Sequence, residues 1–346
     1  MAKNILISGG AGFIGCNAAQ RYALQGARVT IIDQLSRTGS ERNLDWINSL
    51  KLPNVTFLKA DIRDAKSISD VFEKEAFDLV LHLAAQVAVT LSIQDPVYDH
   101  AVNTLGTLNM LEGLRKSKNP KAYFVFASTN KVYGGLEDLD ISEGDTRYHL
   151  TKLPNGIPES RNLDFHSPYG CSKGAADQYT RDYARIYGLN TVVFRQSCIY
   201  GPQQVGIEDQ GWIAWFVRKA LQNASVNVYG TGKQVRDLLF IEDLLEAYDL
   251  AEANVEKTKG QIYNMGGGPA SAKSVIEVLE IIKKDFPDLN WQFEPWRAGD
   301  QKVYISDLSN AERDFGWRPK TSAVEGIARL ISWARENQHT LPAIKF

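Results

Sequence analysis

Three tyrosine–lysine pairs with the spacing Tyr-x-x-x-Lys could carry acid–base chemistry in this chain. They are Tyr148/Lys152, Tyr169/Lys173 and Tyr229/Lys233. A phenol with a pKa near 10 is a poor base at neutral pH, but a lysine ammonium one helical turn away stabilises its phenolate. Such a tyrosine can take the proton of an alcohol while hydride leaves the same carbon for a nicotinamide cofactor. The spacing places both side chains on one face only where the segment is helical.

The segment that begins "SPYGCSK" predicts a helix around the second pair. Ser167 can cap the helix N-terminus, Pro168 suits the first helical position, and helical periodicity continues as far as Gly188. We therefore expect Tyr169 and Lys173 to share one face in the first two turns of a long helix. The alternative is that both side chains only pack on the helix surface.

The other two pairs lie in segments that predict irregular structure. Gly230 and Gly232 indicate a turn within the third pair. The first pair is followed by two prolines and a glycine, "LPNGIP" (153–158), which indicates a loop. We expect neither pair to do chemistry.

The elements that must position the second pair alternate between strand and helix in the first half of the chain. Apolar runs that predict buried strands cover residues 4–9, 27–33, 55–61, 77–84 and 122–128. Helical patterns cover residues 13–26, 64–75 and 99–117. The alternation predicts an α/β fold with a doubly wound parallel sheet of the Rossmann type, in which ligands bind at the carboxyl ends of the strands. Ser128 and Thr129 lie at the end of the fifth strand, where a hydroxyl donor would complete the site.

The first strand-to-helix turn, "GGAGFIG" (9–15), satisfies the glycine spacing of a dinucleotide-binding loop. Its glycines allow a tight turn and close approach of a pyrophosphate to the helix N-terminus. Asp33 ends the second strand, where a carboxylate accepts hydrogen bonds from ribose hydroxyls and repels a 2′-phosphate. Arg37 could accommodate such a phosphate, but Asp33 lies closer to the strand end, so we expect NAD. The alternative is a glycine turn that serves packing only.

The second half of the chain is less regular. Helical patterns cover 212–221, 242–253 and 272–284. We expect an NAD-binding domain over 1–197, to which later segments near 235–265 return, and a smaller α/β domain for the substrate over most of 198–346. The aromatic side chains of Trp212, Trp215 and Phe216 have helical spacing, so we interpret them as core or subunit interface rather than as a sugar platform.

Composition narrows the class of protein. The 346 residues have a formal net charge of −2 and a pI near 6.3, and no long basic run predicts nucleic-acid binding or membrane binding. The N-terminal apolar stretch is too short for a signal peptide or a membrane span. Cys16, Cys171 and Cys198 lack the spacing of metal ligands. We expect a cytoplasmic protein without a bound metal.

Several stretches together resemble the extended short-chain dehydrogenase/reductase family of nucleotide-sugar epimerases and dehydratases. They are "GGAGFIG", "DIRD" (61–64), "LHLAAQ" (81–86), "ASTNKVYG" (127–134), "YGCSK" (169–173), "FRQSCIYGP" (194–202), "GKQVRDLLFIEDL" (232–244), "YNMGGG" (263–268) and the segment 297–321. The resemblance covers nearly the whole chain. It implies a nucleotide-sugar substrate, NAD as a tightly bound cofactor, and a homo-oligomer, either a dimer or a tetramer.

The resemblance also assigns site residues. It implies that Thr129, Tyr169 and Lys173 are catalytic. The implied cofactor-binding residues are Gly9, Gly12, Phe13, Ile14, Gly15, Asp33, Arg37, Asp61, Ile62, Leu83, Ala84, Ala85, Gln86, Asn103, Ser128, Tyr169 and Lys173. The implied substrate-binding residues are Gln86, Asn130, Arg236 and Arg297, of which the two arginines would hold the diphosphate because a guanidinium fork matches phosphate oxygens.

The residues after Thr129 favour one branch of the family. The 4,6-dehydratases carry two acids there and the glucuronate decarboxylases carry a glutamate, whereas this chain has Asn130 and Lys131. The segment 163–179 resembles the CDP-tyvelose 2-epimerase branch, which implies conversion of CDP-paratose to CDP-tyvelose by transient oxidation at C2, for lipopolysaccharide O-antigen biosynthesis. Cys198 stands where many 4-epimerases have an asparagine, which leaves a phosphate contact there in doubt. The alternatives are a nucleotide-sugar 4-epimerase and a catalytically inactive NAD-binding sensor.

Overall fold

The structure is a computed structural model that describes residues 2–297 and 299–341. Contacts between residues divide the chain into two compact units, each built from several segments. Unit 1 comprises Met1–Thr129, Ser167–Arg195 and Tyr248–Tyr263, and unit 2 comprises Asn130–His166, Gln196–Ala247 and Asn264–Phe346. The ends of these ranges at residues 1 and 342–346 lie outside the described part.

The two units differ from the ranges expected from the sequence. Residues 130–166, which we expected in the first domain, group with unit 2. The reason is long-range backbone pairing, because Ile157 bridges to Ser306 and Tyr148 N donates to Lys233 O over 3.0 Å. Residues 248–263 belong to unit 1 and lie within the segment that we expected to return.

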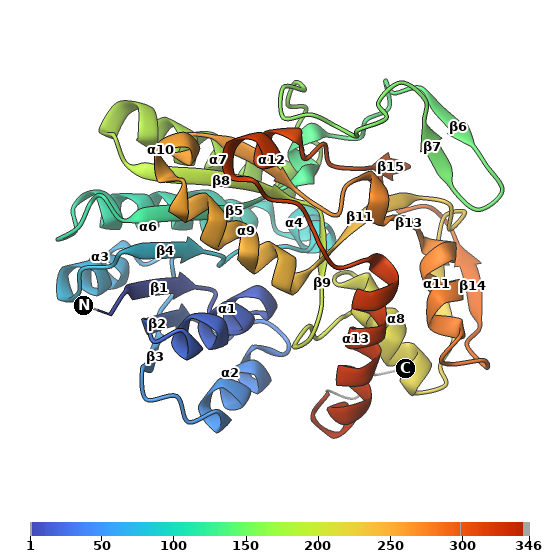
Figure 1. Cartoon of the computed structure of the whole chain (residues 1–346), viewed down its shortest axis with the longest axis horizontal. Helices are drawn as coiled ribbons and strands as arrows, with labels where there is room; N and C mark the ends of the chain where they lie inside the picture. The colour runs from blue at the N-terminus through green and yellow to red at the C-terminus, as the bar shows by residue number, and fades with distance from the viewer. Residues whose placement is uncertain (1, 298, 342–346) are drawn as a thin grey trace. The chain divides into compact units, whose positions relative to one another are not determined.

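A seven-stranded sheet forms the centre of unit 1 (Figure 1), with the order β12-β8-β5-β4-β1-β2-β3. The strands are β1 Asn4–Ser8, β2 Arg28–Asp33, β3 Val55–Lys59, β4 Leu79–His82, β5 Tyr123–Thr129, β8 Asn190–Gln196 and β12 Ile262–Met265. The pairs β1–β2, β2–β3, β1–β4 and β4–β5 are parallel. Strands β1 and β4 are buried along their whole length, as their unbroken apolar runs predict. The doubly wound parallel sheet is therefore confirmed.

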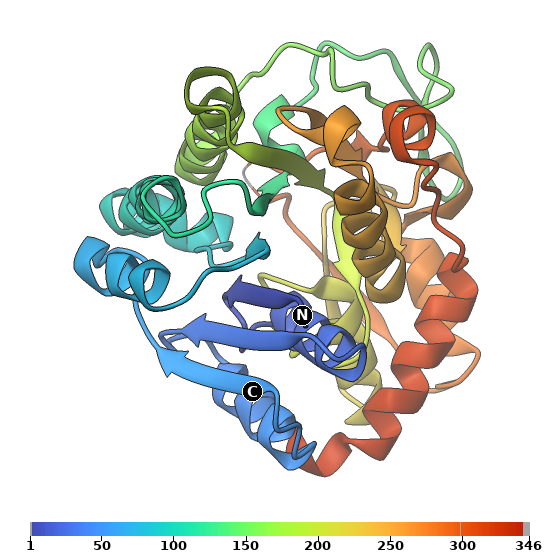
Figure 2. The same ribbon diagram turned by 60° about the vertical axis from the view of Figure 1, so that its left-hand side comes forward.

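Helices cover both faces of this sheet, as Figure 2 shows. The helices of unit 1 are α1 Phe13–Leu24, α2 Ser40–Ser49, α3 Ala65–Lys74, α4 Val89–Gln94, α5 Pro96–His100, α6 Gly106–Arg115, α7 Ser167–Tyr187 and α10 Val255–Thr258. Side chains of α3, α6 and α7 form an apolar core with the sheet that includes Phe72, Met110, Leu111, Phe124 and Ala176. The order of the strands changes direction between β1 and β4, so their carboxyl ends flank the switch point where such sheets bind ligands.

The helical stretch expected over 99–117 is interrupted. A π-helix, η1 Ala101–Leu105, separates α5 from α6 without a break in the chain. Such wide turns are rare in α-helices and occur frequently at functional sites. Asn103 lies within this turn and is buried.

Unit 2 consists of shorter sheets with helices around them. Its strands are β6 Ile141–Glu143, β7 Tyr148–Leu150, β9 Cys198–Tyr200, β10 Val226–Tyr229, β11 Val235–Phe240, β13 Ala272–Ser274, β14 Trp291–Glu294 and β15 Val303–Tyr304. Its helices are α8 Trp212–Leu221, α9 Ile241–Ala253 (whose last turns belong to unit 1), α11 Val275–Lys283, α12 Ser309–Phe315 and α13 Ala323–Glu336, with short 3-10 turns at Asn130–Tyr133, Pro269–Ser271 and Gln338–Thr340.

Two expectations for unit 2 are corrected. The helix expected over 272–284 begins at Val275, because 272–274 form β13, which pairs antiparallel with β11, and Ser274 caps the helix in a capping box with Glu277. Tyr148 was expected in a loop but starts β7, which forms a hairpin with β6. The aromatic segment of α8 is consistent with core packing, since Phe216 is buried and its ring lies 5.4 Å from that of Trp212.

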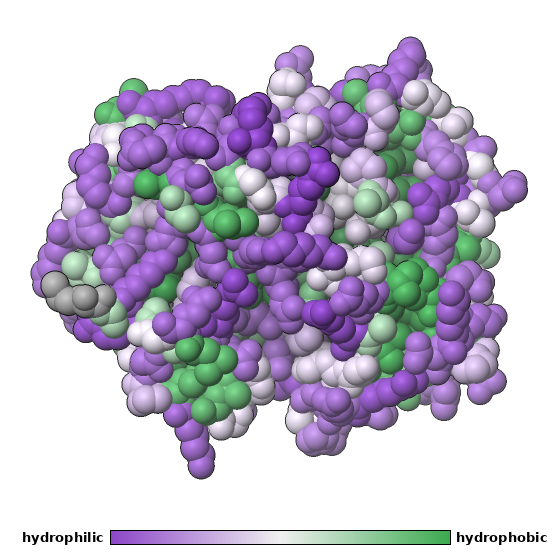
Figure 3. Space-filling model, viewed as in Figure 1, coloured by the Kyte–Doolittle hydropathy of each residue, from purple (hydrophilic) through white to green (hydrophobic). Residues whose placement is uncertain are grey.

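The face in Figure 3 is mostly hydrophilic, with an apolar area over α11 and β14. Strand β14 exposes the side chain of Phe293, and Trp296, which follows this strand, is also exposed. None of the helices within residues 2–297 and 299–341 is both long enough and apolar enough to cross a bilayer.

Candidate functional site

The turn between β1 and α1 leaves no room for side chains. Gly12 N donates to Gly9 O over 2.9 Å, and a Cβ at Gly15 would lie 2.2 Å from the same oxygen. Gly9 has φ +71° and approaches the chain after β4 so closely that its Cβ would meet Ala84 N at 2.7 Å. The turn therefore presents bare backbone at the N-terminus of α1, where backbone N–H groups and the helix dipole favour an anion. Phe13 and Ile14 follow as the first residues of α1.

Asp33 ends β2 beside this turn. Its carboxylate accepts hydrogen bonds from Ala11 N at 3.1 Å and Leu35 N at 2.8 Å. Burial raises the pKa of Asp33, while these backbone donors and the Arg37 guanidinium act in the opposite direction. Asp33 therefore ties the glycine turn to the end of β2.

The remaining cofactor-binding residues expected in unit 1 follow the ends of β3 and β4. Ile62 is buried, and its carbonyl accepts from Asn109 Nδ2 over 2.8 Å. An ion pair with Arg63 lowers the pKa of Asp61. The loop 83–86 starts with Leu83 N donating to Ser8 O over 3.1 Å. It continues through Ala84 and Ala85 to the buried Gln86.

Tyr169, Lys173 and Thr129 come together in unit 1. Thr129 is the last residue of β5, and its side chain hydrogen-bonds with that of Tyr169 in the first turn of α7. Lys173 Nζ donates to Ala127 O over 2.6 Å. Tyr169 is 8% exposed and Lys173 is 3% exposed. Ser167 has φ +71°, and its Oγ accepts from Gly170 N over 3.3 Å, in agreement with the expected capping role.

Burial shifts both titratable groups of the pair. It raises the pKa of Tyr169 to about 12, although the Thr129 hydrogen bond and Arg37 act to lower that value. It lowers the pKa of Lys173 to about 7, although Asp177 and Asp99 act to raise that value. A buried phenol and a buried ammonium of this kind are typical of sites that transfer protons. In general, a lysine ammonium near a tyrosine favours the phenolate form of that tyrosine.

A second buried cluster in unit 1 is a hydrogen-bond network of four side chains that no sequence pattern had linked. Its members are Gln86, Asp99, Asn103 and Ser172. Asp99 accepts hydrogen bonds from Gln86 Nε2 at 2.7 Å, from Asn103 Nδ2 at 3.1 Å and from Ser172 Oγ. Asn103 also donates to Gln86 O and Ser172 Oγ and accepts from Gln86 N. Asn103, which we expected to bind the cofactor, thus uses both of its side-chain polar atoms within the protein. In the sequence, only the four-residue spacing of Asp99 and Asn103 within a predicted helix could have indicated that these two members of the network lie on one face.

The side chain of Ser128 belongs to another buried cluster of unit 1, which is centred on Asp177. Its Oγ donates to Asp177 Oδ2 over 2.8 Å, and the same carboxylate accepts from Arg195 Nε at 2.9 Å and Arg195 Nη2 at 3.1 Å. Asp177 is 0% exposed and Arg195 is 2% exposed, so the ion pair is fully buried. The structure therefore places Ser128, which we expected to bind the cofactor, in a link between β5, α7 and β8.

In unit 2, the segment 299–301 accepts hydrogen bonds from three side chains, those of Asn130, Lys131 and Arg236. Asn130 Nδ2 donates to Gln301 Oε1 over 3.1 Å, and Lys131 Nζ donates to Gly299 O over 3.2 Å. Arg236 donates to Gln301 O at 2.8 Å and to Asp300 Oδ1 at 2.6 Å. Burial and the nearby Arg236 lower the pKa of Lys131 to about 8.

Arg297 lies next to this segment in unit 2, and its carbonyl accepts from Asp300 N over 3.3 Å. Its guanidinium is 3.7 Å from the centroid of the Tyr229 ring and 3.3 Å from the Asp209 carboxylate. Cys198 starts β9 and accepts from Trp212 Nε1 over 3.0 Å, while burial raises the pKa of its thiol to about 12.

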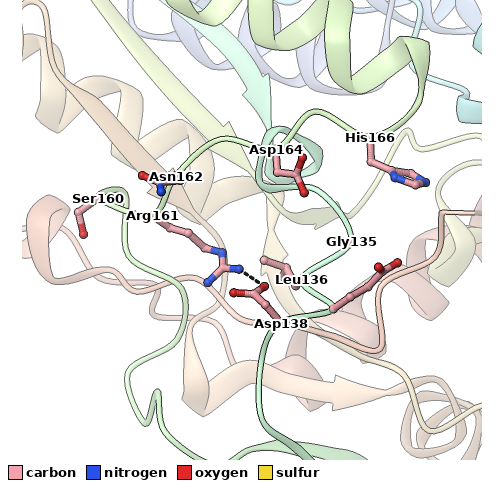
Figure 4. Close-up of a pocket in the computed structure, with 9 residues that line it drawn as sticks. Gly135, Leu136, Asp138, Ser160, Arg161, Asn162, Asp164 and His166 are labelled. Atoms are coloured by element: carbon pink, nitrogen blue, oxygen red, sulfur yellow. Dashed lines mark hydrogen bonds and ion pairs between the residues drawn. The ribbon is translucent and has the colours of Figure 1, made fainter.

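Unit 2 contains a cavity of about 600 Å³, and Figure 4 shows the residues that line it. It is lined by Gly135, Leu136, Glu137, Asp138, Ser160, Arg161, Asn162, Asp164 and His166, and Arg161 pairs with Asp138 across it. None of the site residues expected from the sequence lines this cavity. Within the described residues, no group of three or more His, Cys, Asp or Glu side chains is arranged to hold a metal ion.

The fold and these clusters define a class of proteins in which a dinucleotide-binding sheet carries a Tyr-x-x-x-Lys helix. The model of the family described as GDP-mannose 4,6 dehydratase matches residues 6–330. The chain therefore belongs to this family of nucleotide-sugar epimerases and dehydratases within the extended short-chain dehydrogenases/reductases. This membership confirms the family that the sequence motifs indicated.

Individual relatives extend over nearly the whole chain. A CDP-paratose 2-epimerase of Salmonella typhi is 44% identical over 95% of this chain and 98% of its own length. The crystal structure of a UDP-glucose 4-epimerase from Thermotoga maritima with UDP-glucose has a TM-score of 0.84 at 30% identity, covering 97% of this chain and 99% of that one. A Thermus thermophilus UDP-glucose 4-epimerase in complex with NAD has a TM-score of 0.80 at 30% identity, covering 96% and 99%.

Proposed function

We propose that this protein is an NAD-dependent epimerase that converts CDP-paratose to CDP-tyvelose by transient oxidation at C2. The observation that carries the proposal is the Thr129–Tyr169–Lys173 cluster of unit 1, in a chain 44% identical to a CDP-paratose 2-epimerase. The cluster supplies a proton path to an alcohol. The choice of substrate rests on the similarity to this relative, because the geometry of the cluster does not specify a substrate.

The residues of unit 1 fit NAD. The side-chain-free turn at Gly9, Gly12 and Gly15 would receive the pyrophosphate, and Asp33 would accept hydrogen bonds from the ribose hydroxyls and disfavour a 2′-phosphate. Arg37 and the segments 61–62 and 83–86 would border the same cofactor. When bound, NAD supplies reversible hydride acceptance. A similar epimerase of Thermus thermophilus was crystallised with NAD, which supports this choice over NADP.

The proposed acid–base cycle uses the tyrosine twice. Tyr169 removes the proton of the C2 hydroxyl as C2 is oxidised, and it returns the proton after the sugar has presented its other face. Lys173 stabilises the phenolate in between, and Thr129 holds the phenol by a hydrogen bond. The cycle needs no proton transfer at carbon, because the C2 hydrogen of the resting sugar adjoins no carbonyl and is not acidic.

Unit 2 would bind the nucleotide part of the substrate. Arg236 and Arg297 would hold the diphosphate through charge-assisted hydrogen bonds, and Asn130 would contact the sugar. Asn130 and Lys131 stand where a dehydratase needs acids, so elimination of water has no catalyst here. The Trp212 hydrogen bond to Cys198 supports the view that Cys198 packs rather than binds phosphate.

A 4-epimerase of UDP-hexoses is the second candidate. It is favoured by the Thermotoga maritima structure, which aligns over almost the whole chain. The two reactions use the same cluster and differ only in which carbon is oxidised. An inactive NAD-binding sensor is not favoured, because a sensor does not need the proton path that Thr129, Tyr169 and Lys173 retain.

Isotopic labelling tests the reaction. CDP-paratose with deuterium at C2 is incubated with the NAD-loaded protein in normal water, and the product is analysed by NMR for configuration and deuterium content. Hydride that leaves C2 and returns there keeps the deuterium, so we expect inversion at C2 with full retention. Loss of deuterium to solvent would contradict the mechanism, and inversion only at C4 of a UDP-hexose would favour the second candidate.

We also propose that the protein is a cytoplasmic homo-oligomer that serves lipopolysaccharide O-antigen biosynthesis. Neighbouring helices of unit 1 expose large apolar side chains, namely Leu91, Ile93, Val97, Leu105, Ile186 and Tyr187. Exposed apolar side chains on neighbouring helices are a feature of subunit interfaces. Light scattering coupled to gel filtration would show a dimer or a tetramer, and a monomer at micromolar concentration would contradict this part.

A further inference from the structure

Asp99 is a fully buried acid of unit 1 to which the proposed cycle gives no role. It lies on α5 with 0% exposure, just before the π-helix. Its Oδ1 accepts from Gln86 and Asn103, and its Oδ2 accepts from Ser172. Ser172 lies between Tyr169 and Lys173 in α7, and its Oγ also lies 3.2 Å from Tyr169 O. One carboxylate thus contacts three segments that meet at the proposed proton path.

The partners of Asp99 favour its ionised form. The amides of Gln86 and Asn103 present N–H groups to Oδ1, and an amide N–H can only donate. The Ser172 hydroxyl donates as well. Burial raises the pKa of Asp99, but the hydrogen bonds from Ser172 and Gln86 and the nearby Lys173 and His100 act to lower it. The carboxylate is therefore held as an acceptor.

The negative charge of Asp99 has no cationic partner at contact distance. Among the ion pairs of residues 2–297 and 299–341, none includes Asp99. Asp177, the other acid near Lys173, differs because two hydrogen bonds tie it to Arg195 and make that pair neutral overall. Of the two carboxylates, Asp99 is thus the one whose charge is not already balanced.

Lys173 needs such a charge. Its ammonium lies 4.2 Å from the centroid of the Phe126 ring and donates to a backbone carbonyl, so it is largely removed from water. The titratable groups that interact electrostatically with it are His82 from β4, Asp99 from α5 and Asp177 from α7. Burial lowers the pKa of His82 to about 3, so this imidazole, which hydrogen-bonds with Ser8 and Thr107, is neutral. Asp99 then remains as the source of unbalanced negative charge.

We propose that Asp99 is a positioning residue for Tyr169 and Lys173. Its carboxylate joins the loop after β4 to the first turns of α7, and it supplies the fixed negative charge that the buried Lys173 ammonium requires. The catalytic meaning of this inference rests on the proposed function, but the arrangement of Asp99 does not.

The substitution Asp99→Asn removes the charge while nearly preserving the shape. Both Lys173 and Tyr169 should then lose protons at lower pH, because Asp99 raises the pKa of each. We expect the pH profile of turnover to move to lower pH by about one unit, as is typical when a single nearby charge is removed. On the alkaline side of the profile, kcat should fall about tenfold with little change in KM.

The closing experiment follows Tyr169 directly. The full chain, loaded with NAD and labelled with ¹³C at tyrosine Cζ, is titrated by NMR, and the Tyr169 signal is assigned by its loss in Tyr169→Phe. We expect a lower titration midpoint in Asp99→Asn and the wild-type midpoint in Asp243→Asn. Asp243 is a matched control, because it is a buried carboxylate of unit 2 that accepts from Thr321 N.

An unchanged midpoint in a folded Asp99→Asn variant would overturn the proposal. Asp99→Glu decides if the asparagine variant does not fold, because it keeps the charge and should keep the wild-type midpoint; a midpoint lowered in this variant too would also overturn the proposal. The titration needs no sugar. If CDP-paratose is not converted, the proposed function fails while the titration still decides on Asp99.

Discussion

The two units hold their expected site residues in different ways. In unit 1, Thr129, Tyr169 and Lys173 lie at the end of a strand and in the first turns of a long helix, and all three are buried. In unit 2, Arg236 and Arg297 are only partly buried and pair with carboxylates of loops. The groups that would move protons are therefore buried, whereas the arginines that would hold phosphate are partly exposed and already paired with loop carboxylates.

This difference suits two different tasks. A proton-transfer group needs a fixed position and a shifted pKa, which burial and rigid elements provide. A phosphate-binding arginine must release its ligand at each turnover, and a partly exposed ion pair such as Arg236 with Asp300 contributes little energy that binding must overcome. We therefore expect substitutions in unit 1 to affect kcat or stability strongly, and substitutions in unit 2 to affect KM.

The largest effect is expected for Tyr169→Phe. Phenylalanine keeps the ring but removes the proton carrier, which lowers kcat by about 10²–10⁴-fold. The thermal unfolding midpoint should change little, since the substitution removes mainly the hydrogen bond between the phenol and Thr129. Tyr148→Phe is the matched control, because that hydroxyl interacts with Thr231 in unit 2. Equal losses of kcat in both variants would show that the wrong pair was chosen.

The second effect concerns the buried ion pair of unit 1. Asp177→Asn leaves Arg195 buried without its counter-ion, which should lower the free energy of unfolding by about 3–5 kcal/mol. Urea unfolding at neutral pH measures the change. Asp70→Asn is the control, because its pair with Lys66 is exposed and should contribute nothing measurable. A stable Asp177→Asn variant would mean that water or another group compensates Arg195.

A smaller effect is expected for Arg236→Lys in unit 2. Lysine keeps the charge but loses the planar fork, so KM for the nucleotide sugar should rise about tenfold while kcat changes little. Steady-state kinetics measure both constants. Arg329→Lys alters an exposed arginine that pairs with Glu242 and Glu325, and it should change neither constant. A fall in kcat alone would place Arg236 with the proton-transfer groups and would weaken the contrast between the units.

The smallest expected effect is a rise in the free energy of unfolding on substitution of Lys131. Burial lowers the pKa of Lys131 to about 8, so at pH 7 the folded protein holds a half-buried ammonium. Lys131→Met should raise the free energy of unfolding at pH 7 by about 1–2 kcal/mol. Between about pH 8 and the unfolded lysine pKa near 10.4, the unfolded chain binds more protons, so the wild type gains stability and the advantage of the variant shrinks.

Unfolding measured at pH 7 and near pH 10 checks this sign. Lys320→Met, at an exposed lysine that pairs with Glu246, should change the free energy of unfolding little at either pH. An advantage for Lys131→Met that is independent of pH would contradict the electrostatic cause.

Local patterns predicted the parts of unit 1 that depend on local structure. The glycine turn, the carboxylate at the end of β2 and the helix that starts near Pro168 each have a signature of a few residues. The strand–helix alternation predicted β1 to β5 and their parallel arrangement, which follows from crossover connections, but β8 and β12 were not among the expected strands. The pair Tyr169/Lys173 could be chosen among the three candidate pairs because the start of its helix also has a local signature.

The remainder depends on contacts between distant residues. Asp99 and Ser172 are 73 positions apart, and no short pattern links them. The same holds for β13, whose three residues continue a helical pattern in sequence and become a strand only because β11 lies beside them. The grouping of 130–166 with unit 2 likewise depends on pairing with residues near 233 and 306.

The π-helix between α5 and α6 changes the direction in which side chains point around the axis of an otherwise continuous helix. A π turn holds one residue more than the α turn that it replaces, so the side chains on its two sides are offset by about 100° compared with an uninterrupted α-helix. Winding the same residues as an uninterrupted α-helix would turn either Asp99 away from Ser172 or the buried face at Met110 and Leu111 away from the core. Deleting one residue from 101–105 would instead restore a regular helix in which both faces keep their directions. The wide turn thus holds one extra residue while the contacts on both sides of it are kept.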